Sequence, residues 1–186
     1  MAVNLTTNMV PGYLAGTWAI DPVHTDVSFT VRHLMVGRVR GRFHDVSGTI
    51  VLGEDPLESS MSAVIELASV DTGNEQRDND IRSAGFLDVE RFPTMAFRST
   101  GVRQDRDRFV VEGELDLHGV TRPVEMLVEV HGFATDPYGS VRAGFTATTA
   151  LDRRDFGINI DLPMPGNGVV VGYEVKVHLE VEAVLT

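Results

Sequence analysis

The sequence predicts an all-β protein whose antiparallel strands close into a barrel or stack as a sandwich. Apolar and polar residues alternate with a period of two along several segments, as in strands that bury one face and expose the other. Short segments rich in Gly, Pro and Asp separate them and indicate turns. About eight strands of about ten residues fit a single domain in this 186-residue chain, and closure into a barrel leaves no free edge.

The expected strands follow one another along the chain. Weak alternation marks the first near 17–21, and the second, 27–35, is much clearer. Its apolar face carries Val27, Phe29, Val31, His33 and Met35. Further clear strands are expected at 109–118, 124–131 and 174–183, and weaker ones near 41–52, 61–70, 94–102 and 140–151. The glycine-rich stretch 37–41 is interpreted as a turn or bulge.

One segment breaks the alternation and predicts a short helix over 74–85. It has no β-branched residue except Ile81. Thr72 or Asn74 is a suitable N-cap, and Gly85 suits the left-handed position that follows a last helical turn. The apolar residues that come next, Phe86, Leu87 and Phe92, are candidates to cover one end of a barrel.

Composition excludes several classes of protein. The chain has no cysteine, which rules out disulfides, thiolate catalysis and cysteine-based metal sites. Its formal net charge of -11 argues against a nucleic-acid partner, although Arg38, Arg40 and Arg42 form a short basic run. No stretch is as long as a transmembrane segment, and the first residues do not resemble a secretory signal. We therefore expect a cytoplasmic protein with a flexible tail over 1–16 and one barrel domain over 17–186.

The histidines and serines form no recognisable catalytic or metal-binding motif. The six histidines lack the spacing of a metal site, so surface or hydrogen-bonded histidines are the simpler interpretation, and no metal is expected. His33 differs because it shares a face with apolar residues, where it is either a satisfied core group or a contact to a ligand head group. No GxSxG elbow marks an activated serine.

Five charged residues leave three interpretations open. Capping and surface ion pairs are the simplest of these. Recognition of an anionic or carbonyl head group is the second, because arginine donates paired hydrogen bonds to such oxygens. Acid–base catalysis at a barrel mouth is the third. The residues concerned are Arg77, Asp78, Arg153, Arg154 and Asp155.

Motifs spread over the whole chain resemble the YceI-like family of lipid-binding proteins. The first is Ile20-Asp21-Pro22-Val23-His24-Thr25, with Phe29 and His33 following at the family spacing. Those in the middle are Val70-Asp71-Thr72-Gly73, Arg77-Asp78, Phe86-Leu87-Asp88-Val89 and Phe92-Pro93. Two more, Gly119-Val120-Thr121-Arg122-Pro123-Val124 and Arg154-Asp155-Phe156-Gly157, extend the match over 17–186. The order of these motifs is more specific than any one of them.

The resemblance implies a lipocalin-like, extended up-and-down barrel that binds polyisoprenoids or related amphiphiles in its pore, with no other cofactor. The ligand-binding residues then expected are Val27, Phe29, Val31, His33, Met35, Phe43, Ile65, Arg77, Asp78, Met95, Phe97, Phe145, Asp155 and Phe156. The chain departs from the family at Asp80-Ile81, where many members have His-Leu, so no role of that histidine transfers. Many members also carry a secretory signal, so a periplasmic location does not transfer either.

Three functions are consistent with the sequence. The favoured one is a carrier or sequestering protein for an isoprenoid lipid such as a quinone, which burial of the tail would hold at about 0.8 kcal/mol per CH₂. The alternatives are an enzyme that modifies such a lipid and a filled-barrel interaction module. Alternation cannot choose between a hollow and a solid barrel, because inward apolar residues look the same in both. A homodimer is the commonest assembly for a chain of this kind.

Overall fold

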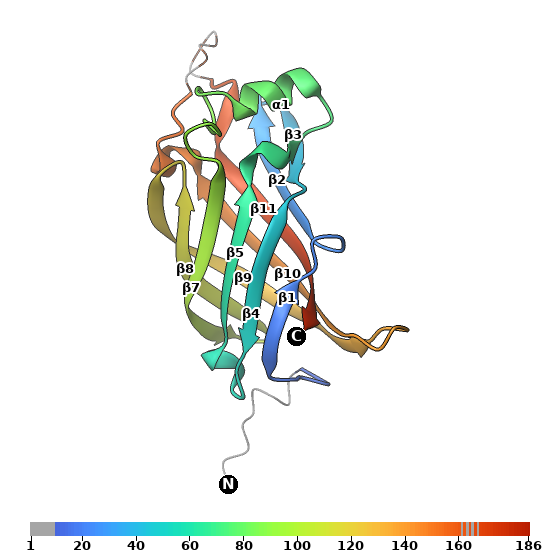
Figure 1. Ribbon diagram of the computed structural model, residues 1–186. Coiled ribbons are helices and arrows are strands. Elements are labelled where there is room, and N and C mark those ends of the chain that lie inside the picture. Colours follow the sequence, from blue (N-terminus) through green and yellow to red (C-terminus); the bar gives the residue numbers. More distant parts are fainter. Residues whose placement is uncertain (1–9, 161, 163, 165, 167) are drawn as a thin grey trace.

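The computed structural model describes residues 10–160, 162, 164, 166 and 168–186, and it confirms a closed antiparallel barrel (Figure 1). Eight strands close on themselves because the first, β1 (Gly16–Ile20), pairs with the last, β11 (Val171–Leu185). Between them, in sheet order, lie β4 (Val46–Leu52), β5 (Ser60–Glu66), β7 (Thr94–Asp105), β8 (Arg108–Leu117), β9 (Val120–Thr135) and β10 (Val141–Asp152).

Three further strands make the wall taller at one end. β11 pairs with β1 through its last residues and with β2 (Asp26–His33) through earlier ones, so β1 and β2 act as one interrupted strand. In the same way β3 (Gly37–Phe43) pairs with β2, while β4 pairs with β1. The short β6 (Val70–Asp71) pairs with the last residues of β3. The interior at this end is therefore enclosed by strands that the eight-stranded barrel alone would not supply.

The chain leaves the predicted pattern at the β2–β3 hairpin. The strand expected over 27–35 ends at His33, because Leu34 and Met35 adopt left-handed conformations with φ of 51° and 61°. These two residues and Val36 form the tip of the hairpin. The prediction that Met35 continues the inward face of the strand is therefore wrong, since a strand cannot propagate through left-handed residues.

Two other strand predictions need correction. The stretch 37–41 is not a turn or bulge but most of β3. The strand expected over 41–52 is divided between β3 and β4 by His44 and Asp45, which lie between the two strands. The one expected over 61–70 contains β5, the short 3-10 helix η3 (Leu67–Ser69) and the start of β6.

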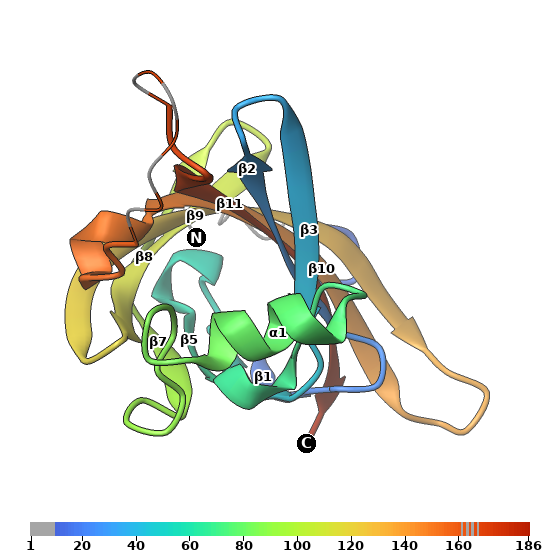
Figure 2. The ribbon, with the colours of Figure 1, turned by 90° about the horizontal axis from the view of Figure 1, so that it is seen from above.

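The predicted helix is present as α1 (Glu75–Arg82), and it lies over one end of the barrel (Figure 2). We call this end the helix end. Asn74 is the N-cap, as predicted, and its side chain accepts a hydrogen bond from the N–H of Arg77 at 2.9 Å. The predicted role of Gly85 is wrong, because the helix ends earlier and Ser83 caps it with ordinary extended dihedral angles. Within the described part of the chain, no helix is long and apolar enough to cross a membrane.

The opposite end of the barrel is covered by residues that the sequence assigned to a flexible tail. Residues 1–9 of that tail lie outside the described chain. Val10, however, is buried, and the hydroxyl of Tyr13 donates a hydrogen bond to the carbonyl of Gly53 at 2.7 Å. Tyr13 also contacts the ring of Phe133 edge-on at 5.7 Å. This part of the segment is packed against the barrel, together with the 3-10 helix η2 (Pro56–Glu58).

Candidate ligand-binding cavity

Side chains do not fill the interior of the barrel. On β11, Val175, Val177, Leu179 and Val181 alternate with exposed polar residues, yet they retain accessible surface of their own. In a solid core such residues would be sealed by close-packed neighbours. They instead line two cavities, Val175 and Val177 the one at the helix end and Leu179 and Val181 the other. The structure thus shows a hollow barrel, a point that the sequence left open.

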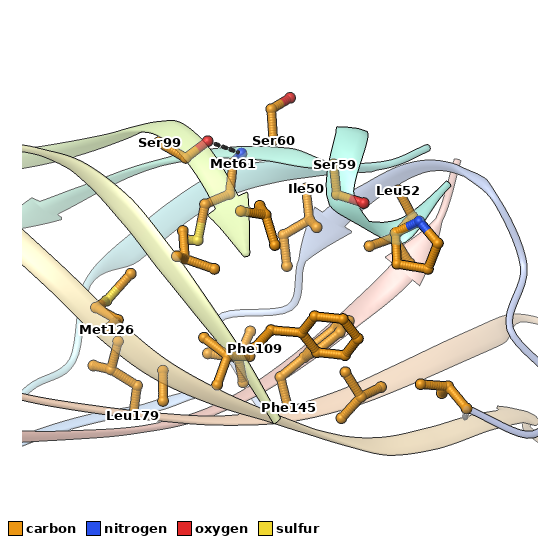
Figure 3. A pocket seen from close by; sticks show the side chains of 18 of the residues that line it. Ile50, Leu52, Ser59, Ser60, Met61, Ser99, Phe109, Met126, Phe145 and Leu179 are labelled. Atoms are coloured by element: carbon orange, nitrogen blue, oxygen red, sulfur yellow. Dashed lines mark hydrogen bonds between the residues drawn. The ribbon is translucent and has the colours of Figure 1, made fainter. Parts of the chain in front are cut away.

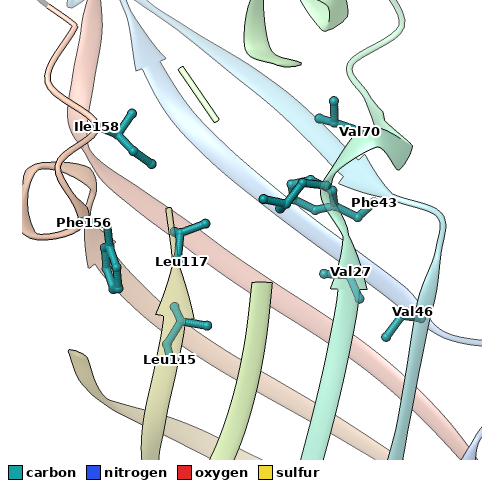
Figure 4. Close-up of a cluster of buried hydrophobic side chains, with 9 residues drawn as sticks. Val27, Phe43, Val46, Val70, Leu115, Leu117, Phe156 and Ile158 are labelled. Atoms are coloured by element: carbon teal, nitrogen blue, oxygen red, sulfur yellow. The ribbon is translucent and has the colours of Figure 1, made fainter. Parts of the chain in front are cut away.

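The larger space, which we call the upper cavity, lies at the helix end. Its volume is about 390 Å³, within the range of about 300 to 1,000 Å³ that small-molecule sites occupy. Val27 and Phe43 on one side face Leu117, Phe156 and Ile158 on the other (Figure 4). These walls come from β2, β3, β8 and the segment after β10, so several distant parts of the sequence build one apolar chamber.

A few polar residues stand among the lining of the upper cavity. His33 comes from the exposed end of β2, Arg77 and Asp80 come from α1, and Arg153 comes from the 3-10 helix η4 (Arg153–Phe156). Ser28 and Arg32 of β2 also border this cavity, and the remaining lining is apolar. An apolar chamber with polar groups at one end suits an amphiphile, whose tail avoids water while its head group needs hydrogen bonds.

Arg153 is a buried cation in the wall of the upper cavity. Its guanidinium donates hydrogen bonds to four backbone carbonyls, those of Gly172 at 3.0 Å, Ile158 at 2.5 Å, Ile160 at 3.1 Å and Val171 at 2.9 Å. These bonds tie η4 and the segment after it to the beginning of β11. A buried charge needs such partners, and here they fix a positive charge beside an apolar chamber.

Arg77 and Asp78 fasten α1 to the turn that precedes it. The carboxylate of Asp78, which is buried, accepts hydrogen bonds from the N–H of Thr72 at 2.8 Å and from its hydroxyl at 2.6 Å. Arg77 donates to the same hydroxyl at 2.7 Å and to the Thr72 carbonyl at 2.9 Å. Asp78 is therefore turned towards the backbone, whereas Arg77 stays at the edge of the cavity.

A smaller space, which we call the lower cavity, lies at the opposite end of the barrel. Its volume is about 100 Å³. Met61 and Leu52 from one wall face Met126 and Phe145 from the other (Figure 3). An apolar cavity of this size stays dry, because water would find no polar partners there. The end of an apolar chain is the kind of group that it accommodates.

Phe97 lies between the two cavities and lines neither. It follows Met95, which lines the upper cavity, and precedes Ser99, which lines the lower one. Its ring packs directly against Gly113 on the neighbouring strand β8, where the lack of a side chain makes room for it. Phe97 also packs against the buried residues on both sides of this level. Phe97 thus lies at the level where the lining of the upper cavity gives way to that of the lower one.

The structure brings most of the sequence-predicted binding residues together. The upper cavity is lined by Val27, Phe29, Val31, His33, Phe43, Arg77, Met95 and Phe156, and the lower cavity by Phe145. Ile65 and Phe97 pack against the same buried cluster without lining either space. Met35 lies at the hairpin tip, Asp78 faces Thr72, and Asp155 is exposed on η4 away from both cavities.

Sequence reasoning missed several lining residues. Val175 and Val177 stand on the apolar face of the last strand, so the alternation that predicted the strand was the signal that could have found them. Arg153 was one of the five charged candidates, but nothing in the sequence distinguishes it from Arg154. Only the fold shows that Arg153 is buried. Arg154 is exposed, and its guanidinium lies 2.5 Å from the carboxylate of Asp152.

One cluster of the described residues has the composition of a metal site. Ligand atoms of Asp21, His24 and Glu182 lie within 4.8 Å of one another. The guanidinium of Arg142 already stands between the two carboxylates, 2.7 Å from Asp21 and 2.6 Å from Glu182. Because this cation supplies the positive charge that the acids need, the arrangement is an ion-pair network.

Comparison with known sequences agrees with the geometry. The sequence pattern of the YceI-like domain matches residues 18–183. The chain belongs to this family. A UPF0312 protein of Photorhabdus laumondii is 36% identical over 152 residues, which cover 80% of this chain and 79% of that protein. Protein YceI of Salmonella newport is 39% identical over 140 residues, covering 75% of this chain and 73% of that protein.

Solved structures show the same fold. BcnA of Burkholderia cenocepacia superposes with a TM-score of 0.76 at 19% identity and covers 88% of this chain and 98% of its own. A polyisoprenoid-binding domain from Saccharophagus degradans, implicated in plant cell wall breakdown, gives a TM-score of 0.69 at 16% identity, over 93% of this chain and all of that domain. At these identities the likeness concerns the fold of the YceI-like barrel.

Proposed function

We propose that this protein binds a long-chain isoprenoid lipid, such as a polyprenyl lipid or an isoprenoid quinone, and carries, stores or sequesters it. The observation that carries the proposal is the upper cavity, an apolar chamber with polar groups at one end. The solved domain from Saccharophagus degradans, which has the same fold, is described as polyisoprenoid-binding, and this supports the same class of ligand. Burial of the tail supplies the affinity, at about 0.8 kcal/mol per CH₂.

The polar groups at the mouth assign an orientation to the ligand. His33, Arg77 and Arg153 stand at the helix end, so the head group lies there and the tail extends towards Phe97. A phosphate or carbonyl oxygen in the head group accepts hydrogen bonds from such donors. Arg77 bonds to the backbone of Thr72, which holds its guanidinium group in place for a ligand. The guanidinium of Arg153 is engaged by four backbone carbonyls, so it contributes its positive charge to this end of the chamber.

Two of the acid–base candidates that the sequence offered do not face the chamber. Asp78 is occupied by Thr72, and Asp155 lies outside both cavities, so neither is in a position to exchange a proton with a ligand in the chamber. General acid–base catalysis requires the catalytic group within hydrogen-bond reach of the reacting atom. His33 and Asp80 do line the chamber, so the proposal of binding without chemical change rests on the predominantly apolar lining.

Organic extraction of the purified protein, followed by mass spectrometry, tests this proposal. A stoichiometric polyprenyl or quinone species would support it and name the ligand. A blank extract from protein that also takes up no added long-chain isoprenoid contradicts it.

The variant Val177→Phe tests the location of the site. Val177 lines the upper cavity from β11, and a larger side chain there occupies part of the chamber without adding charge. We expect about tenfold weaker isoprenoid binding, since the ring displaces roughly two CH₂ groups of the tail at about 0.8 kcal/mol each. Val64→Phe is the matched control, because Val64 is exposed on β5. Equal binding by the two variants would place the ligand elsewhere.

A further inference from the structure

The tip of the β2–β3 hairpin exposes three consecutive apolar residues. Leu34, Met35 and Val36 have 38%, 49% and 91% of their surface exposed. Leu34 and Met35 hold left-handed conformations, which residues with a side chain adopt only where the surroundings enforce them. A hydrogen bond from the N–H of Leu34 to the carbonyl of Val170, at 2.9 Å, fixes the tip against a neighbouring segment. The fold thus holds apolar side chains in water where turns ordinarily carry polar ones.

A second exposed apolar residue belongs to the segment beside this tip. Leu162 is 49% exposed, and it lines the upper cavity together with His33. Met35 and Met164 lie next to the same residue, Gly168, where a Cβ atom would be 3.9 Å from the first and 3.6 Å from the second. The exposed apolar residues therefore gather around the mouth of the upper cavity. Gathered exposure of this kind marks an interaction surface, whereas scattered exposure does not.

Arginines flank the tip on the outer face of the hairpin. Arg32 on β2 lies opposite Arg38 on β3, and Arg40 follows on the same face. All three are exposed, and among the described residues none of them makes a hydrogen bond or an ion pair. Arg103 on β7, in contrast, is paired with Glu112 at 3.1 Å. Unpaired positive charges gathered on a chain of net charge -11 favour an anionic partner.

We propose that this hairpin surface, made of Leu34, Met35, Val36, Leu162 and the three arginines, docks on an anionic lipid bilayer. The apolar tip enters the boundary between head groups and acyl chains, and the guanidinium groups stay at the level of the phosphates. Docking places the mouth of the upper cavity against the membrane from which an isoprenoid would enter or leave. This purpose rests on the proposed function, whereas the docking itself does not.

Acidic residues on neighbouring elements determine which side of the mouth meets the bilayer. The exposed charges of α1 are Glu75 and Asp80, because Arg77 and Arg82 are partly buried and bond to backbone carbonyls, and Asp78 is buried. An anionic surface repels these exposed acids, so the helix remains in water. Glu174 on β11 is also acidic, but it lies 3.8 Å from Lys176, which offsets its charge. The contact is therefore confined to the hairpin side.

The arginines could instead protect the free edge of β3 from pairing with another chain, and this role predicts a different result. Only Arg42 and Phe43 of β3 pair with β6, so the rest of that strand has a free edge, and charged side chains hinder such an edge from pairing with another chain. Edge protection alone predicts no affinity for lipid.

Sedimentation of the whole chain with lipid vesicles tests the proposal. We expect binding to phosphatidylcholine vesicles that contain phosphatidylglycerol, little binding to phosphatidylcholine alone, and a decline with added salt. Replacing Arg38 and Arg40 together by serine should weaken binding about thirtyfold, which is about fivefold for each arginine. Val36→Asp should weaken it roughly tenfold, because an inserted apolar side chain is lost.

Two substitutions elsewhere serve as controls. Arg106→Asn removes an arginine from the β7–β8 turn at the opposite end of the barrel. Val23→Asp adds the same charge as Val36→Asp at a residue that is 82% exposed, between β1 and β2 and about 25 Å along β2 from the hairpin tip. Both controls should bind vesicles as the unaltered protein does. If the hairpin variants did so too, or if the unaltered protein bound no anionic vesicles, the docking proposal would be overturned.

A second measurement separates docking from the proposed function. Hairpin variants that take up isoprenoid from detergent micelles but not from anionic vesicles support docking as the route of exchange. If the unaltered protein bound the vesicles yet took up isoprenoid from neither source, the proposed function alone would be contradicted.

Discussion

At the scale of single residues, Phe97 determines how much of the barrel is open to one ligand. Its ring lies against Gly113, at the level between the upper and the lower cavity. A tail that fills only the upper cavity leaves this ring in place. A longer tail reaches the lower cavity only if the ring turns aside. We therefore predict that this residue sets the length of chain that binds without rearrangement.

The variant Phe97→Ala is expected to join the two cavities. Affinity for long isoprenoid alcohols should rise relative to short ones, because more CH₂ groups are then buried at about 0.8 kcal/mol each. The free energy of unfolding should fall by about 3 kcal/mol, as for other losses of a packed aromatic ring. Phe97→Leu, which keeps most of the apolar volume, is the control. Titration with alcohols of graded length measures the effect, and an unchanged length preference would show that the ring is no partition.

The same residues show what a sequence can predict about a cavity. Alternation identified Phe29, Val31 and Phe43 as inward-facing because the period of a strand depends on local geometry alone. It could not show that the space between these residues is empty, since hollowness depends on the distance between strands far apart in sequence. Met35 was misplaced for a related reason. The backbone of the hairpin tip is left-handed, but the tip contains no glycine or asparagine, the residues that usually indicate such a conformation.

At the scale of elements, α1 is too short to be stable by itself. An isolated helix of this length is unfavourable in water, so the contacts of α1 must hold it over the cavity. Asp78 bonds to Thr72, and Arg82 donates to the carbonyls of Ala68 and Val70 at 2.8 Å each. These hydrogen bonds therefore hold α1 in place over the cavity. We expect the barrel to remain folded when they are removed.

The variant Asp78→Ala tests this description of α1. It leaves the N–H and hydroxyl of Thr72 without their acceptor. We expect the free energy that holds α1 against the rest of the protein to fall by about 2 kcal/mol. Hydrogen exchange should accelerate in the amides of α1 much more than in the barrel strands, and bound isoprenoid should dissociate faster. Gln76→Ala, at an exposed position of the same helix, should change neither. Uniform acceleration over the whole barrel would instead make Asp78 part of the global fold.

The position of this helix could be predicted but its attachment could not. The N-cap at Asn74 is a local signal, and it was found. The burial of Asp78 depends on the turn at Thr72 and on β3 beneath it, where the Thr72 methyl group and the ring of Phe29 crowd Gly41. Because charged residues on helices are usually solvated, the sequence alone favoured a ligand or surface role for Asp78.

At the scale of the molecule, closure of the barrel is secured by an ion-pair network at the seam between its first and last strands. Arg142 on β10 bonds to Asp21 after β1, to Glu182 on β11 and to Asp136 before β10. Arg142 and, secondarily, His24 lower the pKa of Asp21 well below its usual range, and Arg142 also lowers the pKa of Asp136. These residues stand where β1 ends and the chain crosses to β2.

The network predicts how stability depends on pH. Because the pKa of Asp21 is lower in the folded than in the unfolded chain, its carboxylate stabilises the fold above about pH 4, and this contribution is lost as pH falls towards the lowered pKa. Asp21→Asn should cost about 2 kcal/mol at pH 7 and should flatten the acid limb of a plot of unfolding free energy against pH. Asp116→Asn, on the outer face of β8, is the control. Parallel acid limbs for all three proteins would contradict the role of Asp21.

The pairing of β1 with β11 also has a kinetic consequence. Trp18 lies opposite Leu185, so the barrel cannot shut during synthesis until its final strand has emerged, and the apolar inner faces of the earlier strands stay uncovered until then. Trp18 is the only tryptophan of the chain, and it is fully buried at this seam against Phe133. Its fluorescence is therefore expected to report the moment of closure, so the protein carries its own probe for this step of its folding.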